Sequence, residues 1–344
     1  MFYIIYKVKL FSIFLRKSME NNLVFVSAHP DIPYFHWQTK VYTNNFIEKG
    51  IKPENIHVLF LMVNGITQPT EESLKLKSLG INVHHYLDNR KDKKYIPSLR
   101  PLALSNWLKE NPELGKYYFY HDSDIIFREL PDFDKLLKDD IVYLSDTLSY
   151  ISYDYIMGCC QRYETQYKHL EKNHLINMMS DIVGVSLETI KLNNKNSGGA
   201  QYLIKNTDYT FWDKVFNDSE TLYKQLFEFN MKHRIPSGEI QLWTADMWAV
   251  LWNLWYTGHE TKIVTDLSFS WATDTISTYE RHPILHMAGV TEDLKATKFY
   301  KGEFINVNPL KKLEENPNYF DYIDKNSSTI KYIDQMKKVL KNEL

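Results

Sequence analysis

Between residues 23 and 146 the sequence alternates short apolar runs with amphipathic segments, and this alternation limits the fold more than any other feature. The apolar runs have the length and composition of buried β-strands, and they lie at 23–28, 56–63, 81–86, 117–122 and 141–146. The segments between the first four runs have helical spacing. Because strands separated by helices require crossover connections, the pattern predicts an α/β fold with a mostly parallel central sheet flanked by helices.

The length of the chain predicts more than one compact unit. Its 344 residues exceed the ~250–300 at which single hydrophobic cores usually stop growing. We expect an N-terminal extension at 1–20, a large domain at 21–308 and a helical C-terminal tail at 309–344. Within the large domain we expect two halves, at 21–146 and at 147–308, because the alternation of apolar runs and amphipathic segments ends at residue 146.

Composition excludes several classes of protein. Hydrophobic residues make up 44% of the chain and charged residues 24%, as in ordinary globular proteins. The net charge of −2 argues against a nucleic-acid partner. No GxGxxG sequence follows the first apolar run, which excludes dinucleotide binding of that type. The two cysteines, Cys159 and Cys160, are adjacent, which disfavours a disulfide between them and is typical of a reducing compartment.

The first 18 residues are apolar but do not have the features of a membrane span. Lys7 and Lys9 interrupt the run, which is too short to cross a ~30 Å hydrocarbon core. No cleavage site of small residues follows. We therefore expect no integral membrane span and a cytoplasmic location, with a peripheral membrane contact through residues 1–18 as the alternative. The sequence leaves the oligomeric state open.

The segment YYFYHDSDIIF at 117–127 contains two aspartates directly after its aromatic run. Asp122 and Asp124 lie at the carboxyl end of a predicted buried strand, the edge at which α/β proteins bind ligands. Two carboxylates suit a divalent cation such as Mn²⁺ or Mg²⁺, which in turn holds phosphate oxygens. The alternative interpretation is an aspartate pair that caps a turn or a helix.

The segment NSGGAQYL at 196–203 predicts a second polar edge. Asn196 and Ser197 precede Gly198 and Gly199, and an apolar strand follows. Paired glycines let the backbone approach a ligand closely because they have no Cβ. A plain hairpin turn is the alternative.

A single carboxylate, Asp246, lies in the strongly aromatic segment EIQLWTADMWAVLWNLW, which predicts a helix at 239–255. A buried carboxylate needs a partner. Asp246 therefore either has a structural partner or faces an active cleft, and the sequence leaves both open.

A late histidine completes the pattern. His286 ends the short apolar run HPILHMAG at 282–289, and imidazole can complete a Mn²⁺ site with two carboxylates. A structural histidine is the alternative. Lys295, Lys298 and Lys301 follow and could neutralise a departing diphosphate, although lysine runs are usually solvated surface.

Together these motifs resemble the GT-A glycosyltransferases, which use a nucleotide-sugar donor and a divalent metal. A closer resemblance is to plant peptidyl glycosyltransferases, the hydroxyproline O-arabinosyltransferases and the peptidyl-serine α-galactosyltransferases. It extends patchily over most of residues 23–290 and is carried by SAHPDIPYFHWQTKVYTNNF (27–46), YIPSLRPLALSNWLKENPE (95–113), HDSDIIFRELPDF (121–133) and WTADMWAV (243–250). The plant enzymes often have a metal triad of the E-P-D-H kind instead of Asp122-Ser123-Asp124, and residues 147–195 show no resemblance. The identity of the acceptor is therefore not carried over.

The resemblance implies that a hexose or pentose passes from a UDP-sugar to a hydroxyl of a glycan or peptide, with Mn²⁺ or Mg²⁺ bound and with retention of configuration. It also implies that residues 21–146 form the nucleotide-binding half and residues 147–308 the acceptor-binding and catalytic half. The implied metal ligands are Asp122, Asp124 and His286. Catalytic roles fall to Arg100, which would orient the donor or Asp122, to Asn196, which would hold sugar hydroxyls, and to Asp246, which would contact the sugar or stabilise the developing cation. The implied substrate-binding residues are Ser27, Ala28, Trp37, Gln38, Arg100, Ser123, Ser197, Gly198, Gly199, Gln201, Trp243, Gly289, Lys295 and Lys298.

Two other functions fit parts of the pattern. A phosphatase of the haloacid-dehalogenase type also has a strand that ends in DxD, but it places that motif in its first strand, with Thr or Val two residues after the second aspartate. Here three predicted strands precede the motif and Ile126 stands at that position. A non-catalytic carbohydrate-binding protein on the same fold is the other alternative, and the intact set of candidate metal ligands disfavours it. Metal-dependent binding of UDP distinguishes the three functions.

Overall fold

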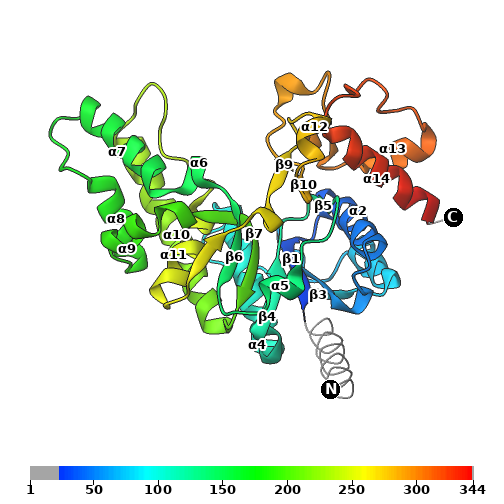
Figure 1. The fold of residues 1–344 in the computed structure, drawn as a ribbon, viewed down its shortest axis with the longest axis horizontal. Coiled ribbons are helices and arrows are strands. Elements are labelled where there is room, and N and C mark those ends of the chain that lie inside the picture. Colours follow the sequence, from blue (N-terminus) through cyan, green and yellow to red (C-terminus); the bar gives the residue numbers. More distant parts are fainter. Residues whose placement is uncertain (1–22, 343–344) are drawn as a thin grey trace, which may run out of the picture.

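The computed structural model describes residues 23–342, so the predicted extension at 1–20 lies outside the described residues. A seven-stranded sheet in the order β3-β2-β1-β4-β7-β6-β8 forms the centre of the molecule (Figure 1). Strands β3, β2, β1 and β4 are mutually parallel, as are β6 and β8, which confirms the predicted α/β class with a mostly parallel sheet. The bounds are β1 Val24–Pro30, β2 Ile56–Met62, β3 Asn82–Leu87, β4 Tyr117–Tyr120, β6 Val142–Asp146, β7 Gly198–Lys205 and β8 Thr261–Ile263.

Strand β7 runs antiparallel to both of its neighbours, β4 and β6. Tyr202 of β7 lies opposite Tyr120, the last residue of β4, so the start of β7 extends past the carboxyl end of β4. Asp146 at the end of β6 pairs with Gly198 at the start of β7. The NSGG segment is therefore at the same edge of the sheet as the aspartate motif.

A second, three-stranded sheet brings the late histidine to this edge. Its order is β5-β10-β9, with β5 at Ile125–Phe127, β9 at Phe269–Trp271 and β10 at Ile284–His286. Because β10 runs antiparallel to β5, His286 lies opposite Ile125, directly after the aspartate motif. The sequence KIVTDLSFSW at 262–271 looks like a single strand, but a 3₁₀ turn at Thr265–Leu267 divides it. Its first part belongs to β8 in the large sheet and its last part to β9 in the small sheet.

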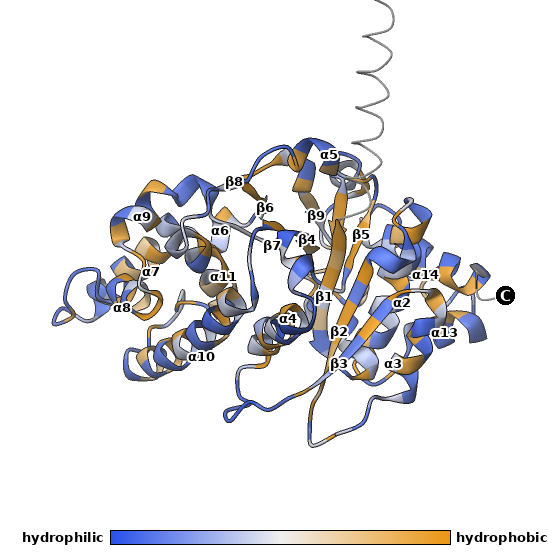
Figure 2. Ribbon diagram, turned by 90° about the horizontal axis from the view of Figure 1, so that it is seen from below, coloured by the Kyte–Doolittle hydropathy of each residue, from blue (hydrophilic) through white to orange (hydrophobic). Residues whose placement is uncertain are grey.

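Helices cover the large sheet, and apolar side chains concentrate on its strands (Figures 1 and 2). The helices α10 and α11 pack against each other, and α10 also packs against α4. Helices α6 to α9 lie on the same side of the molecule as α10 and α11 (Figure 1). The bounds are α2 Pro33–Glu48, α3 Glu71–Lys75, α4 Leu99–Glu110, α5 Phe133–Leu136, α6 Leu148–Ile151, α7 Tyr153–Gln166, α8 His174–Val183, α9 Leu187–Leu192, α10 Tyr209–Lys232, α11 Ala245–Tyr256 and α12 Ile276–Tyr279.

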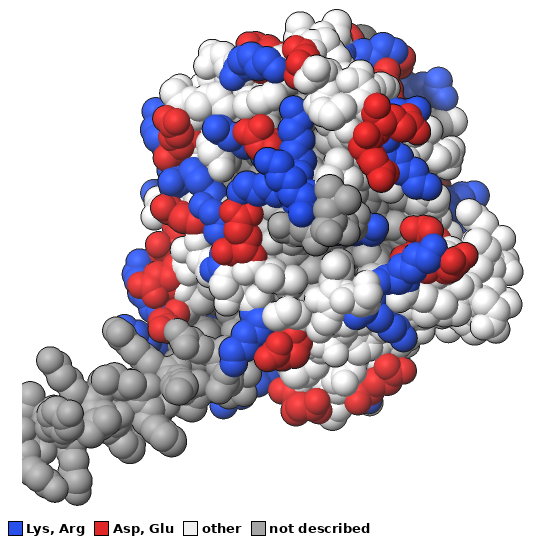
Figure 3. Space-filling model, turned by 90° about the vertical axis from the view of Figure 1, so that its right-hand side faces the viewer, with Lys and Arg blue, Asp and Glu red and all other residues white. Residues whose placement is uncertain are grey.

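The C-terminal tail forms a second apolar core with α2 and the small sheet. Its helices are α13 (Pro309–Glu315) and α14 (Thr329–Asn342), and α14 packs on α2. Trp37 of α2, Leu285 of β10 and Tyr332 of α14 are buried together in this cluster. On the face that carries this part of the molecule, basic and acidic side chains are interspersed (Figure 3), which agrees with the small net charge of −2.

The predicted helix at 239–255 is shorter in the structure. Helix α11 begins at Ala245, so the first six residues of the predicted segment lie outside it. Asp246 is consequently in the first turn, where the helix dipole favours a negative charge, and not in the middle of the helix. Among the described residues, no helix has the length and apolar character that a transmembrane segment needs.

Candidate active site

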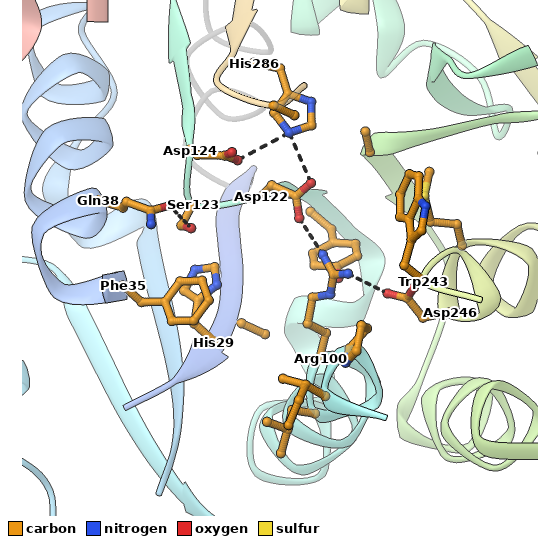
Figure 4. Close-up of a pocket in the computed structure, with 18 of the residues that line it drawn as sticks. His29, Phe35, Gln38, Arg100, Asp122, Ser123, Asp124, Trp243, Asp246 and His286 are labelled. Carbon is orange, nitrogen blue, oxygen red and sulfur yellow. Dashed lines mark hydrogen bonds and ion pairs between the residues drawn. The ribbon is translucent and has the colours of Figure 1, made fainter. Parts of the chain in front are cut away.

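A cavity of about 350 Å³ lies at the carboxyl ends of β1 and β4. Helices α2 and α4, the start of α11 and the end of β10 enclose it (Figure 4). It brings together side chains that are more than 180 residues apart in sequence, from Arg100 to His286. Nine of the residues predicted for the site line this cavity: Ala28, Gln38, Arg100, Ser123, Trp243, Asp246, Asp122, Asp124 and His286.

Asp122, Asp124 and His286 form a cluster that fits a metal ion. Their ligand atoms all lie within 4.8 Å of one another. The Nε2 atom of His286 is 3.5 Å from Oδ2 of Asp122 and 3.3 Å from Oδ1 of Asp124. Two carboxylates and one imidazole are a donor set that suits Mn²⁺ or Mg²⁺. The predicted grouping of these three residues is confirmed.

Lys301 supplies a positive charge to this cluster. Its ammonium contacts the Asp124 carboxylate, and its side chain lines the cavity. Burial acts to raise the pKa of Asp124, but Lys301 and His286 outweigh it, and the pKa lies below its ordinary value. Burial also acts to lower the pKa of Lys301, and Asp124 reverses this, so the pKa is raised. Both groups therefore remain charged at neutral pH.

Arg100 connects the cluster to Asp246. Its Nη1 atom is 2.6 Å from Oδ1 of Asp122, and its Nη2 atom is 2.9 Å from Oδ2 of Asp246 (Figure 4). Tyr95 completes the environment of Asp246, because its hydroxyl lies 2.9 Å from Oδ1 and accepts the Asp246 backbone N–H at 2.8 Å. A planar guanidinium is suited to hold two carboxylates in one fixed arrangement. Arg100 therefore lies where it can orient Asp122, one of the two alternatives predicted for it.

Gln201 lies beside Nδ1 of His286, on the side of the ring away from the aspartates. The Ser145 hydroxyl donates to Oε1 of Gln201 at 2.8 Å and lies 2.7 Å from the Leu267 carbonyl. The amide nitrogen Nε2 of Gln201 lies 3.5 Å from Nδ1 of His286, so the amide can donate to this ring nitrogen. Nε2 of His286 then carries the proton that faces the aspartates, which agrees with the hydrogen bond from His286 that lowers the pKa of Asp124. A metal ion at Nε2 would displace this proton.

Several predicted donor-binding residues are structural. Ser27 is fully buried and hydrogen-bonded to the Tyr42 hydroxyl at 2.8 Å. Trp37 packs in the second core, where its indole donates to the Phe304 carbonyl at 3.2 Å. Gln38, the neighbour of Trp37 in the sequence, does line the cavity, and its Oε1 accepts a hydrogen bond from the Ser123 hydroxyl at 2.7 Å.

The two glycines of the NSGG segment are required for packing between strands and helices. A Cβ on Gly198 would lie 2.5 Å from both the Leu144 Cβ and the Ser145 carbonyl oxygen of β6. A Cβ on Gly199 would lie 2.7 Å from the Met247 side chain of α11. Neither glycine lines the cavity, so the close approach that the sequence predicts is to the neighbouring chain and not to a ligand.

Other predicted site residues also lie outside the cavity lining. Asn196 is in a 3₁₀ turn, and Ser197 is buried, with its carbonyl accepting from Thr147. Further along the chain, Gly289 is in a left-handed turn beside Trp271, Lys295 pairs with Glu292 and Glu303, and Lys298 donates to Ser327. Of the three late lysines, Lys301 is the one that reaches the cavity.

Sequence reasoning missed a stacked ring pair in the cavity wall, formed by the end of β1 and the start of α2. His29 and Phe35 lie parallel, with ring centroids 5.0 Å apart. Burial lowers the pKa of His29, so the ring is neutral at physiological pH. The sequence does contain a signal for Phe35. It lies three positions before Gln38, and residues with this spacing share one face of a helix, here α2. Tyr95, which holds Asp246, has no comparable signal in the sequence.

No protein-family model matches the chain, and no curated protein matches it. The solved structures similar to it include the bifunctional glycosyltransferase WbbM, at 10% identity and TM-score 0.43, over 87% of this chain and 51% of that one. They also include the galactosyltransferase LgtC in complex with donor and acceptor sugar analogues, at 12% identity and TM-score 0.38, over 83% of this chain and 95% of that one. A third is a glycosyltransferase involved in glycosylation of the major capsid of PBCV-1, at 8% identity and TM-score 0.36, over 78% of this chain and 94% of that one. This chain therefore spans about half the length of WbbM, and none of these three structures supports the narrower resemblance to the plant peptidyl enzymes.

Proposed function

We propose that the protein is a metal-dependent glycosyltransferase of the GT-A type, which moves a sugar from a UDP-sugar donor to a hydroxyl of an acceptor. The observation that carries the proposal is the convergence of Asp122, Asp124 and His286 in one cavity, beside an Arg100–Asp246 pair. Many proteins bind metal through such a triad. The adjoining Arg100–Asp246 ion pair, and the cavity of about 350 Å³ that it lines together with the triad, favour transfer of a glycosyl group.

Asp122, Asp124 and His286 are the residues that would hold Mn²⁺ or Mg²⁺. When bound, the cation offsets the negative charge that builds on the diphosphate as the sugar leaves. Lys301 would contribute a second positive charge on the same side, because its ammonium already lies at Asp124. The stacked pair of His29 and Phe35 offers a flat apolar wall for the nucleobase, opposite Asp246 across the cavity (Figure 4).

Asp246 is the residue that would stabilise the developing positive charge on the sugar. Leaving-group departure creates an oxocarbenium-like centre, and a carboxylate with a fixed orientation stabilises it without reorganisation. Arg100 and Tyr95 hold Asp246 in that orientation. The resemblance to retaining glycosyltransferases favours retention of configuration. Asn196 lies outside the cavity lining, so its predicted catalytic role does not form part of the proposal.

Calorimetric titration of the protein with UDP, with and without Mn²⁺, tests the proposal directly. We expect UDP binding that requires the cation, and slow hydrolysis of one sugar from a panel of nucleotide sugars. Hydrolysis of a generic phosphoester without UDP binding would instead indicate a phosphatase. Metal-dependent UDP binding without any turnover would indicate a non-catalytic binding protein. The Asp124→Asn variant is the control, because it removes one proposed ligand and retains the shape of the side chain.

A further inference from the structure

A second groove continues from the cavity on the side away from the stacked His29–Phe35 pair. It has a volume of about 840 Å³ and lies between α6, the start of α7, the turn at Asn194–Asn196 and β9. Trp271 lines both the cavity and the groove. Tyr150 lines the cavity, and its neighbour Ser149 lines the groove. A molecule in the groove could therefore extend past Trp271 into the cavity without passing the His29–Phe35 pair.

Three aromatic rings mark the junction of the cavity and the groove. The Tyr150 ring lies 5.5 Å from the Trp243 ring and 6.2 Å from the Trp271 ring. Trp243 is 52% exposed, although it is one of the largest apolar side chains. Trp271 stacks on His286 at 5.8 Å, which joins this aromatic wall to the candidate metal site. Exposed aromatic faces next to polar groups are typical of surfaces that bind ligands with one apolar face and a polar edge.

Beyond Trp271 the groove carries charges of both signs beside apolar side chains such as Phe269 and Leu148. Asp146 and Asp154 line it together with Lys195. Asn194 lines it too, and its amide donates to Asp154 at 2.6 Å, which ties the turn to the start of α7. A groove of a single sign would favour a polyanion or a basic peptide. Mixed hydrogen-bonding groups beside aromatic faces instead suit an uncharged molecule with many hydroxyls.

We propose that this groove binds the acceptor and that the acceptor is a saccharide, an inference that rests on the proposed glycosyltransferase function. Its ring would lie against Trp243, Tyr150 and Trp271, and the groove would hold the rest of the chain. In the reaction, an acceptor hydroxyl oxygen forms a bond to the anomeric carbon. The bond from that carbon to the diphosphate oxygen breaks, with its electron pair staying on the nucleoside diphosphate. The hydroxyl proton passes to that diphosphate or to water.

The test uses the full-length protein with Mn²⁺ and the nucleotide sugar that it hydrolyses. Two acceptor panels are offered separately, one of methyl glycosides and disaccharides and one of peptides that contain Ser, Thr or hydroxyproline. We expect transfer to members of the saccharide panel. Ser149→Trp, which fills the groove from an exposed position, should raise the acceptor KM at least ~10-fold, and Lys195→Ala should raise it ~3-fold.

The matched control is Ser237→Trp, an exposed serine in a separate depression beside Arg162. Its acceptor KM should equal that of the wild type, and UDP affinity, measured on each variant, reports whether the donor cavity is intact. Transfer to peptides alone, failure to glycosylate any saccharide while the donor is hydrolysed, or an unchanged acceptor KM in Ser149→Trp would each overturn the acceptor assignment. If the wild type neither binds UDP nor hydrolyses any nucleotide sugar, the proposed function itself is wrong. The two failures are therefore distinguishable.

Discussion

Arg100 joins two carboxylate regions that differ in the groups that surround them. Asp246 is held by Arg100 on one oxygen and by the neutral Tyr95 hydroxyl on the other. In the metal region, Asp122 and Asp124 share one imidazole, and Arg100 and Lys301 add two positive charges, the latter from the 3₁₀ helix at Lys301–Phe304. Two carboxylates and an imidazole therefore meet at one point of the metal region, whereas the Asp246 region has a single carboxylate.

This difference predicts which region responds to a ligand. The Lys301 ammonium contacts the Asp124 carboxylate, which is also a proposed metal ligand. A divalent cation and this ammonium would therefore compete for the same negative charge and repel each other. Among the described residues no lysine pairs with Asp246, whose partners Arg100 and Tyr95 belong to the start of α4 and the loop before it. We therefore expect substitutions at the metal region to change ligand affinity, and substitutions at Asp246 to change turnover.

The largest expected effect is loss of the metal region. Asp122→Asn or Asp124→Asn should reduce Mn²⁺-dependent UDP affinity by ~10³-fold, because loss of a charged ligand removes several kcal/mol of interaction with the cation. Calorimetric titration measures the affinity, and circular dichroism checks that the fold is retained. If both variants bound UDP as the wild type does, the metal would have to be elsewhere.

The next effect tests the Asp246 region. Asp246→Asn retains the shape but removes the charge, so kcat should fall ~10²-fold with donor affinity nearly unchanged, since interactions made only in the transition state appear in kcat. A purely structural role through Arg100 and Tyr95 predicts the opposite result, a lower Tm with normal turnover per folded molecule. Both quantities are measured on the same preparation, and a stability effect alone would remove Asp246 from the catalytic machinery.

Gln201 connects the metal region to the interior of the sheet. Gln201→Leu removes the amide that lies beside Nδ1 of His286 and should weaken Mn²⁺ binding ~10-fold, in line with other partners of metal-binding histidines. Titration with Mn²⁺ in the absence of nucleotide isolates this effect from activity. Equal affinity in the Leu variant and the wild type would show that this contact does not orient His286.

Lys301 should have a smaller effect with the opposite sign. Lys301→Met removes a positive charge next to Asp124 and should tighten Mn²⁺ binding by ~3-fold to 10-fold without nucleotide. With UDP present the same variant should bind more weakly, if the ammonium contacts the diphosphate. Lys298→Met is the matched control, because Lys298 donates to Ser327 outside the cavity lining. Weaker Mn²⁺ binding in Lys301→Met without nucleotide would refute the competition.

Asp31 is a buried carboxylate that belongs to neither region and provides a reference for them. Asp31 accepts hydrogen bonds from Thr70 and is 2.6 Å from Nε2 of His36. Burial raises its pKa, but His36 and Thr70 outweigh this and lower it to about 2. A depressed pKa stabilises the fold at pH values above the unfolded pKa of ~3.9, and this stability, on the order of 2 kcal/mol, is lost as pH falls from about 4 toward 2.

Asp31→Asn should therefore lower the free energy of unfolding at pH 7, and its difference from the wild type should shrink below pH 4. Urea unfolding at several pH values measures both quantities. UDP and Mn²⁺ affinities should remain near the wild-type values, because Asp31 does not line the cavity. A stability difference that does not depend on pH would contradict the charged hydrogen-bonded state of this carboxylate.

The predicted site residues that line the cavity are mainly those whose position follows from local geometry. Asp122 and Asp124 follow a buried strand, and the carboxyl end of such a strand is where a ligand binds. Arg100 was found at the start of the helix before that strand. Trp243, Gln38 and Ala28 also line the cavity as predicted. Trp37 was chosen with Gln38, but the side chains of consecutive helical residues point in different directions, and Trp37 packs in the second core.

The sequence by itself determined the α/β class, the strand that carries the aspartate pair and the chemistry that this pair favours, because strand and helix periodicities depend on neighbouring residues. Only the tertiary structure decided that Lys301, and not Lys295 or Lys298, reaches Asp124. It also decided that Gly198 and Gly199 pack against neighbouring elements, and that Tyr95 holds Asp246. These contacts join segments up to 177 residues apart, and their geometry depends on how whole elements pack, for which one sequence has no local signal.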